Sequence, residues 1–408
     1  MKLKDICSKI GSGATPRGGK EAYKESGVPI IRSQNVLDWS FNTDGLAYID
    51  DNQASALANV EVKPEDVLLN ITGDSVARAC IVPDAITPAR VNQHVLILRA
   101  NHKTNSVFLL TWLQSNKPLL LALASSGATR NALTKTMLEE LNINLPPVDV
   151  QFRIAKIVSS IQARIEANTR LNGYLAELAQ TIYNDWFRDF GHWGGQMPSH
   201  WETGVLGDYV TVKRGGSPRP IQEYLSDEGL RWLKIADVSG ISGPYILEIK
   251  EHIKEEGLRK TVHLEPGSLV LSNSATPGIP KILSIDTCIH DGWLYFPQSQ
   301  FTNEWLYCYF LNVRQELVRM ANGSVFQNLK TDIVKNFEVI RPDDETLTSF
   351  QEMVAPLFNL MESCQKENKQ LADLRDTLLP KLMPGEIDVS KVDLTQLNSH
   401  LCVRPPLT

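Results

Sequence analysis

The chain carries one sequence pattern twice, and this duplication restricts its possible folds more than any other feature. At an offset of 202 residues, GVPIIRSQNV (27–36) matches GLRWLKIADV (229–238). The offset is 196 where SGATRNALT (126–134) matches NGSVFQNLK (322–330), because short insertions and deletions separate the copies. The sequence therefore predicts a structural unit of roughly 200 residues that occurs twice.

Each copy begins with strand-like sequence. Short β-branched runs such as VPIIR (28–32) and HVLILRA (94–100) alternate with Gly, Pro, Asn and Asp, which is typical of strands joined by turns. Helical stretches at 104–123 and 303–321 precede Gly127 and Gly323. Each first half is therefore predicted to be a strand-rich domain of the α+β class.

Each copy ends in a long helical pattern. Apolar residues recur at spacings of three and four from Val150 to Phe187, which predicts a helix of roughly 57 Å. The second copy runs from Phe350 to Leu378 and should stop near Pro380, with Pro356 kinking its first turns or marking its start. Two matching apolar faces most simply cover each other; alternatively, each helix packs on its own domain.

An asparagine occupies the same position in both helical patterns, at Asn168 and Asn368. A polar residue on an apolar face is the type that fixes the register of paired helices. The whole pattern divides the chain into a first domain, a helical spacer, a second domain, a second spacer and a tail, at 1–150, 151–195, 196–342, 343–387 and 388–408.

Composition is that of an ordinary globular protein, with 42% hydrophobic and 22% charged residues. No apolar stretch has the length of a signal peptide core or a membrane span, so we expect a cytoplasmic protein without membrane contact. Six cysteines without a Cys-x-x-Cys pair predict neither a metal site nor disulfides. The net charge of −6 does not suggest a nucleic-acid binder, but both glycine-rich loops are locally basic, and local patches decide phosphate contact.

No catalytic motif is present. GSGATPRGGKE (11–21) resembles a phosphate-binding loop, but Ala14 replaces the first glycine and Glu21 the Ser or Thr that should follow the lysine. The nucleophile elbow, the His-Glu-x-x-His pair and the Asn/Asp-Pro-Pro-aromatic motif of DNA methyltransferases are also missing. His94 and His290 could each be catalytic, but a lone histidine beside an apolar strand is more often structural. Binding is therefore favoured over catalysis.

Two similar but non-identical domains with basic loops suit the reading of two short sequences on one DNA duplex. Duplex DNA presents its grooves periodically, so two domains that read it need a fixed separation. Long helices supply such a spacer. The loops also differ where base contacts would have to differ, as in ITGDSVARACIV (71–82) and SNSATPGIPKIL (272–283).

Over nearly its whole length the chain resembles the DNA specificity subunits of type I restriction-modification systems. The resemblance rests on SGATP and RGGSP, IIRSQNV and WLKIADV, VNQHV and CIHDG, LPPVDVQFRIAKIV, and LLPKLMPGEI, in this order. It implies two target-recognition domains, each reading half of a bipartite double-stranded DNA site, and two helices packed as an antiparallel coiled coil. It also implies a non-catalytic chain without its own cofactor or metal. The implied partners are two methyltransferase subunits, which bring S-adenosylmethionine and flip the target adenine, and restriction subunits, which bring ATP and magnesium.

Candidate DNA-contacting residues are polar side chains in predicted loops or at strand ends. Arg and Lys can bind guanine or phosphate, and Asn and Gln can bind adenine. In the first domain they are Thr15, Arg17, Lys20, Arg32, Gln34, Asn35, Asp74, Arg78, Asn92, Gln93, Thr129, Arg130 and Asn131. In the second they are Ser217, Arg219, Lys234, Asp237, Ser274, Thr276, Lys281, His290, Gln327, Asn328 and Lys330. Trp39 and Trp232 could stack on bases, although core packing is the more common role.

Two other functions remain open from the sequence. The chain could be a stand-alone regulator that binds two DNA sites without methyltransferase partners. It could also be an enzyme with an unrecognised active site, which turnover by the pure chain would reveal.

Overall fold

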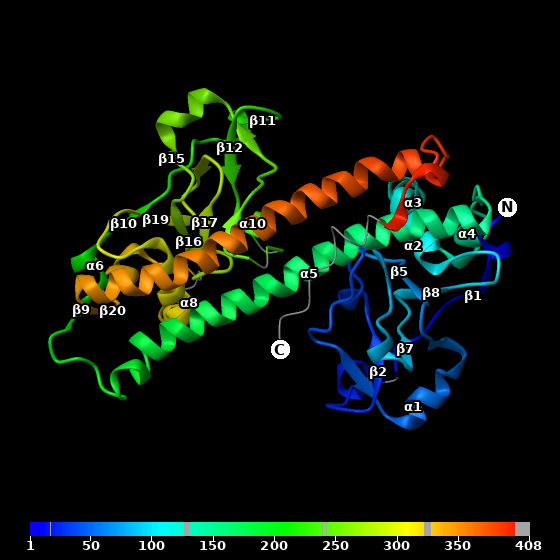
Figure 1. Cartoon of the computed structure of the whole chain (residues 1–408), viewed down its shortest axis with the longest axis horizontal. Coiled ribbons are helices and arrows are strands. Elements are labelled where there is room, and N and C mark those ends of the chain that lie inside the picture. Colours follow the sequence, from blue (N-terminus) through cyan, green and yellow to red (C-terminus); the bar gives the residue numbers. More distant parts are fainter. Residues whose placement is uncertain (17, 126–130, 239, 242, 322–327, 396–408) are drawn as a thin grey trace. The chain divides into compact units, whose positions relative to one another are not determined.

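The computed structural model describes residues 1–16, 18–125, 131–238, 240–241, 243–321 and 328–395. The chain forms two compact units. Unit 1 comprises Met1–Ile165 and Gln370–Thr408, and unit 2 comprises Glu166–Lys369. There are two long helices among the described elements, α5 (Val148–Phe187) and α10 (Asp344–Leu382) (Figure 1). One end of each helix belongs to unit 1, and the other end belongs to unit 2.

The described residues of unit 1 form two four-stranded sheets. The first has the order β1-β8-β5-β6 and the second has the order β3-β2-β7-β4. Their strands are β1 (Cys7–Ser12), β2 (Val28–Ile31), β3 (Ala47–Ile49), β4 (Glu61–Val62), β5 (Val67–Asn70), β6 (Ala79–Ile81), β7 (Ala89–Val91) and β8 (Val95–Ala100).

In the described part of unit 2, two five-stranded sheets have the orders β10-β19-β16-β17-β13 and β11-β14-β12-β18-β15, and β20 pairs with β9. Their strands are β9 (Glu202–Val205), β10 (Val210–Arg214), β11 (Leu225–Ser226), β12 (Leu230–Leu233), β13 (Tyr245–Ile246), β14 (His252–Ile253), β15 (Val262–Leu264), β16 (Leu269–Ser272), β17 (Pro280–Leu283), β18 (Thr287–Ile289), β19 (Trp293–Ser299) and β20 (Glu338–Arg341).

The two units share a topology. In the first sheet of each, β1-β8-β5-β6 corresponds to β10-β19-β16-β17. In the second sheet of each unit, one pair of described strands is parallel, and the two pairs are equivalent: Ile31 lies opposite Val91 in unit 1, and Leu233 lies opposite Ile289 in unit 2. Because Ile31 and Leu233 are 202 residues apart, the sequence repeat is a structural repeat. The predicted strand-rich α+β domains are confirmed.

Helices complete each domain. The stretch predicted at 104–123 forms two helices, α2 and α3, whereas that at 303–321 forms one, α8. Among the described residues no single helix is long and apolar enough to cross a membrane; α2 and α3 meet that test only as a pair bent by 62°. Besides α5 and α10, the described α-helices are α1 (Asp51–Ala56), α2 (Ser106–Ser115), α3 (Lys117–Ser125), α4 (Lys135–Glu139), α6 (Leu206–Tyr209), α7 (Ile235–Val238), α8 (Asn303–Ala321) and α9 (Thr331–Lys335).

Helices α5 and α10 pack on each other in opposite directions, as an antiparallel coiled coil. In unit 1, Arg375 Nη1 donates to Gln162 Oε1 at 3.0 Å. In unit 2, Asn172 Nδ2 donates to the carbonyl of Met361 at 3.3 Å. Residue numbers thus rise along one helix as they fall along the other. The apolar faces of the two helices cover each other. Within each unit, residues of both helices also belong to the hydrophobic core of that unit.

The two asparagines that the sequence singled out lie on this contact. Asn168 is buried, and its Nδ2 donates to Glu367 Oε2 at 2.8 Å. Asn368 Nδ2 donates to Thr169 Oγ1 at 3.2 Å. Each asparagine therefore binds the residue beside the other, and a shift of register would break both bonds. This geometry agrees with the predicted role in register.

Helix α10 begins at Asp344, before the apolar run that starts at Phe350. Asp343 caps it, because its Oδ1 accepts the backbone N–H of Thr346 at 2.8 Å. Pro356 lies well inside the helix and does not mark its start. Pro380 also lies within α10, near its end at Leu382.

The segment after α10 belongs to unit 1. Arg153 on α5 donates through Nε to the carbonyl of Val389 at 2.7 Å and through Nη2 to that of Ser390 at 3.1 Å. Val389 is buried in the core of unit 1. The part of the tail up to residue 395 is thus tied to the first turns of α5.

Candidate nucleic-acid interface

Many of the predicted residues lie on loops at corresponding strand ends of the two units. In unit 1 the loop after β1 meets the turn between β7 and β8, where Gly13 N–H donates to the carbonyl of Asn92 at 3.2 Å. In unit 2 the loop after β10 meets the start of β19, where Gly215 N–H donates to the carbonyl of Trp293 at 2.9 Å. Segments far apart in the sequence therefore form one loop surface in each unit.

A side-chain hydrogen bond recurs across this surface. Thr15 donates its hydroxyl to Gln93 in unit 1, and Ser217 donates to Asp291 Oδ1 at 2.6 Å in unit 2. Both donors and both acceptors occupy equivalent positions of the repeat. The pair fixes the glycine-rich loop to the neighbouring turn, whichever acceptor is present.

The glycine-rich loops need glycine for a reason other than phosphate binding. An ideal Cβ on Gly13 would lie 1.7 Å from the carbonyl oxygen of Val91, and one on Gly215 would lie 2.2 Å from that of His290. The backbone of each loop passes directly over the end of a strand. Packing of the main chain thus accounts for these glycines in both units.

We expect Gly215→Ala to lower the free energy of unfolding by about 1–3 kcal/mol, because the backbone must shift to admit the methyl group. Gly240→Ala is the matched control, since a Cβ there meets nothing within 4 Å. Denaturant unfolding of the full chain measures both variants. Equal stability of the two would contradict the close approach.

In unit 1 several predicted residues are held by neighbours on this surface. Arg32 Nη2 and Gln34 Nε2 both donate to the carbonyl of Gly45, at 2.6 and 3.2 Å. Asp74, Gln93 and Thr15 are exposed. The remaining predicted residues that are accessible here are Arg78, which is half-buried, and Asn131, which is exposed and whose carbonyl accepts the N–H of Gly73.

Two predicted residues of unit 1 are buried. Asn35 has no exposed surface, and its Nδ2 donates to the carbonyl of Asn42 at 3.0 Å. Asn92 is 5% exposed, and its Oδ1 accepts the N–H of His94 at 3.0 Å. Both side chains stabilise turns, so we do not propose that they contact DNA.

Some predicted positions lie outside the described residues. Arg17, Thr129, Arg130 and Gln327 are among them, and the side chain of Lys20 is likewise not described.

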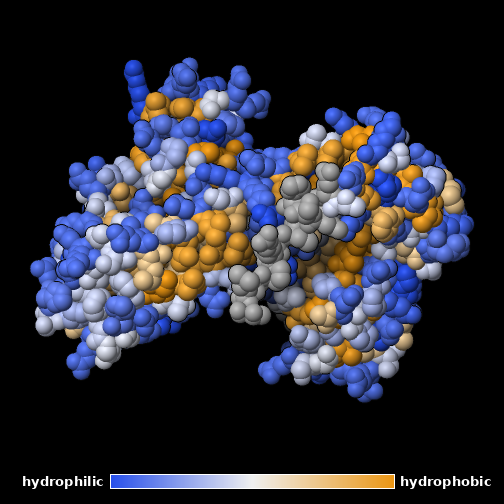
Figure 2. Space-filling view, viewed as in Figure 1, coloured by the Kyte–Doolittle hydropathy of each residue, from blue (hydrophilic) through white to orange (hydrophobic). Residues whose placement is uncertain are grey.

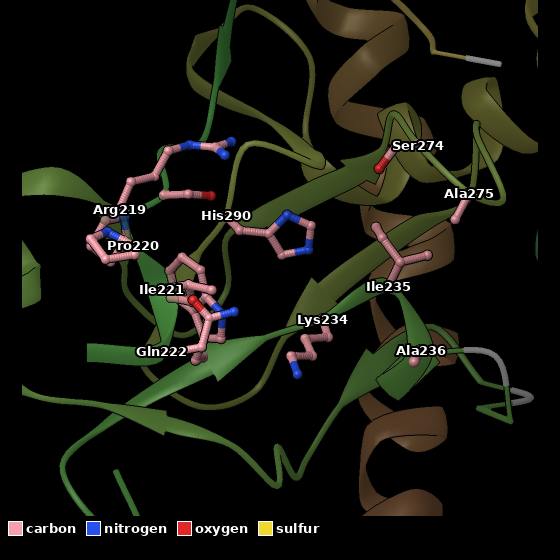
Figure 3. A pocket seen from close by; sticks show the side chains of 13 residues that line it. Arg219, Pro220, Ile221, Gln222, Lys234, Ile235, Ala236, Ser274, Ala275 and His290 are labelled. Atoms are coloured by element: carbon pink, nitrogen blue, oxygen red, sulfur yellow. The ribbon is translucent and has the colours of Figure 1, made fainter. Parts of the chain in front are cut away.

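Unit 2 has a cavity of about 900 Å³ at its loop surface (Figure 3). It lies between the loop after β10, the end of β12, the start of α7 and the turn after β16. Five predicted residues line it: Ser217, Arg219, Lys234, Ser274 and His290. Trp232 also lines it but is 2% exposed, as core packing predicts. Sequence reasoning missed the rest of the lining, chiefly Pro218, Pro220, Ile221, Gln222, Ile235 and Ala275.

Asp291 is the main residue that the sequence did not single out. It accepts from Ser217, and its Oδ2 lies 3.2 Å from Arg219 Nη2 and 3.8 Å from Arg214 Nη2. The Ser217 hydrogen bond, followed by the two arginines, holds the pKa of this carboxyl below its usual range. Its equivalence to Gln93, a predicted residue, was the available signal.

Lys281 was predicted to contact DNA, but it is 5% exposed and donates to the carbonyls of Ile241 and Gly243. Burial lowers the pKa of this ammonium to about 8. Its ammonium binds main-chain carbonyls in the interior, so we do not propose that Lys281 contacts DNA.

Besides Lys281, four described residues of the predicted set in unit 2 lie outside the cavity. Asp237 accepts the N–H of Lys234 at 2.9 Å, and the carbonyl of Thr276 accepts the hydroxyl of Ser272 at 2.6 Å. Asn328 and Lys330 are exposed beside a second cavity, of about 390 Å³, that Arg214 also lines. No cluster of three or more metal-ligating side chains occurs in the described part of the chain.

Comparison with known proteins identifies the family. The model of the type I restriction modification DNA specificity domain matches residues 1–175 and 198–374, one copy on each repeat. The chain is 23% identical to the type I restriction enzyme MjaIX specificity subunit of Methanocaldococcus jannaschii, over 96% of this chain and 94% of that protein. It is 22% identical to the HindI specificity subunit of Haemophilus influenzae, over 88% and 94%.

A solved structure has the same fold. The S subunit of a type I restriction-modification system from M. genitalium superposes with a TM-score of 0.58 at 16% identity, covering 94% of this chain and 95% of that one. The chain therefore belongs to the family of type I restriction-modification specificity subunits, which recognise DNA and are not the catalytic subunits.

Proposed function

We propose that this chain reads a bipartite DNA target, with residues 1–150 reading one half-site and residues 196–342 the other. The observation that carries the proposal is the repeated loop surface. The hydrogen bond from Thr15 to Gln93 recurs as that from Ser217 to Asp291, which we call the framework bond, and Gly13 recurs as Gly215, while the side chains around them differ. A common framework positions each domain on DNA, and differing side chains specify different bases.

The α5–α10 coiled coil is the proposed spacer between the two readers, at residues 151–195 and 343–387. It is also the proposed docking surface for two methyltransferase subunits and for restriction subunits. Large apolar side chains are exposed on its helices, including Tyr174 at 68% and Leu178 at 47% on α5. Figure 2 shows apolar residues reaching the surface in patches, and such patches mark protein interfaces. S-adenosylmethionine, ATP and magnesium would be bound by those partners.

Mapping methylated adenines in a host that expresses this chain with its methyltransferase partner tests the function. We expect one sequence, made of two short half-sites separated by a fixed gap. Methylation of a single continuous sequence, or none, would contradict the bipartite reading.

Arg219→Ala should weaken binding of the assembled complex to DNA. The side chain of Arg219 is 78% exposed at the mouth of the cavity, where it could bind phosphate. For a phosphate contact, the loss is uniform across sequences and the slope of log K against log salt falls by about 1. Titration of labelled duplex at several salt concentrations measures both. An unchanged slope would show that Arg219 does not contact the backbone.

A further inference from the structure

The cavity of unit 2 is lined by three nitrogen-bearing side chains that donate hydrogen bonds, and by Ser217, Gln222 and Ser274, which can both donate and accept. Its walls are apolar, from Ile221, Ile235 and Ala275, and its polar groups include Lys234, Arg219 and His290. Two carboxylates lie beside it: Asp291 accepts from Ser217, and Glu251 accepts from Lys234 through Oε1. An ammonium carries three donors, so Lys234 keeps two after binding Glu251.

The orientation of His290 is fixed by its neighbours. Its Nδ1 accepts the N–H of Gly292 at 2.7 Å. A neutral imidazole that accepts at Nδ1 carries its proton on Nε2. Burial lowers the pKa of this ring; the charge of Asp291 opposes this shift, and the charges of Lys234 and Arg214 add to it. His290 is therefore a neutral donor at Nε2, and its ring projects into the middle of the cavity (Figure 3).

The equivalent position in unit 1 separates structural from recognition roles. Asn92 there accepts the N–H of His94 through Oδ1, as His290 accepts that of Gly292. Both residues thus stabilise the same turn. Only the histidine adds a donor that reaches beyond the turn, because the short Asn92 side chain is buried.

We propose that this cavity is the base-reading site of unit 2, and that His290 and Lys234 donate hydrogen bonds in it to N7 and O6 of a guanine in the major groove. The inference rests on the proposed function. Guanine is the base that presents two adjacent acceptors there, whereas adenine places an amino donor beside N7 and cytosine presents an amino donor. A site that donates to both of these acceptors therefore selects guanine.

The test uses the assembled complex and its mapped target. A duplex in which 7-deazaguanine replaces one guanine of the unit 2 half-site lacks the N7 acceptor at that base. We expect this replacement to weaken wild-type binding about 10- to 100-fold at one position. His290→Asn should bind both duplexes alike, because it lacks the Nε2 donor but keeps the turn in the manner of Asn92. Thermal unfolding checks that the variant is folded.

Lys250→Met is the matched control for Lys234→Met, since Lys250 is exposed in unit 2 and does not line the cavity. Only Lys234→Met should reduce discrimination at the same guanine. A unit 2 half-site without guanine, or a His290→Asn complex with the wild-type penalty at every guanine, would overturn the inference while a bipartite target still stood. Absence of any bipartite target would overturn the proposed function as well.

Discussion

Exchanging residues 1–150 for the matching segment of another specificity subunit is expected to change one half of the methylated sequence completely and leave the other half and the gap unaltered. The physical reason is that the strands and loops of this domain make their framework bonds within the domain itself, such as Thr15 to Gln93. The junction falls in the first turns of α5, which begins at Val148, so the helix after it stays intact.

The measurement is methylated-adenine mapping of a host that carries the exchanged chain and the methyltransferase subunits. The reciprocal exchange of residues 196–342 is the control, and it should alter only the other half-site. If either exchange changed both half-sites, the two domains would not read DNA independently.

Phe350→Ala should remove about 3–5 kcal/mol from the free energy of unfolding, the usual loss for a fully buried phenylalanine. Phe350 lies near the start of α10 and has no exposed surface. Its ring centroid is 5.0 Å from that of Phe187 and 6.2 Å from that of Tyr183, both on α5. The truncation thus opens a cavity where the two helices and the core of unit 2 meet.

Met353→Ala is the control on the same helix, because Met353 is 46% exposed. It should change stability by no more than about 0.5 kcal/mol. Urea unfolding of the full chain, followed by circular dichroism, compares the two. Similar losses would mean that Phe350 does not anchor the coiled coil. The DNA target should be the same for both variants while they are folded.

Much of the architecture could be predicted from the sequence because its signals are periodic and repeated. Spacings of three and four predicted the long helix, which runs from Val148 to Phe187 where the pattern ran from Val150 to Phe187. The start of α10 was harder to predict from the sequence. Pro356, in the middle of the pattern, suggested a helix boundary. The helix instead begins at Asp344, where Asp343 caps it and Phe350 packs in the core of unit 2, so Pro356 lies inside it.

The candidate site was less predictable, because exposure of a polar side chain depends on segments distant in sequence. Lys281 and Asn35 looked like surface loop residues, but each is buried against main-chain carbonyls. Asp291 was overlooked, although it joins Ser217 and Arg219 from more than 70 residues away. No local pattern distinguishes these cases.

The sequence by itself determined that the chain is a duplicated unit, with strand-rich domains and helices that share an apolar face. Those features follow from side-chain periodicity and self-similarity, which are properties of the chain order. Only the tertiary structure decided which loop residues meet, which glycines touch backbone and where a cavity opens. Such contacts join segments brought together by sheet pairing, for example Gly215 over the end of β18, and steric fit in three dimensions has no counterpart in local sequence.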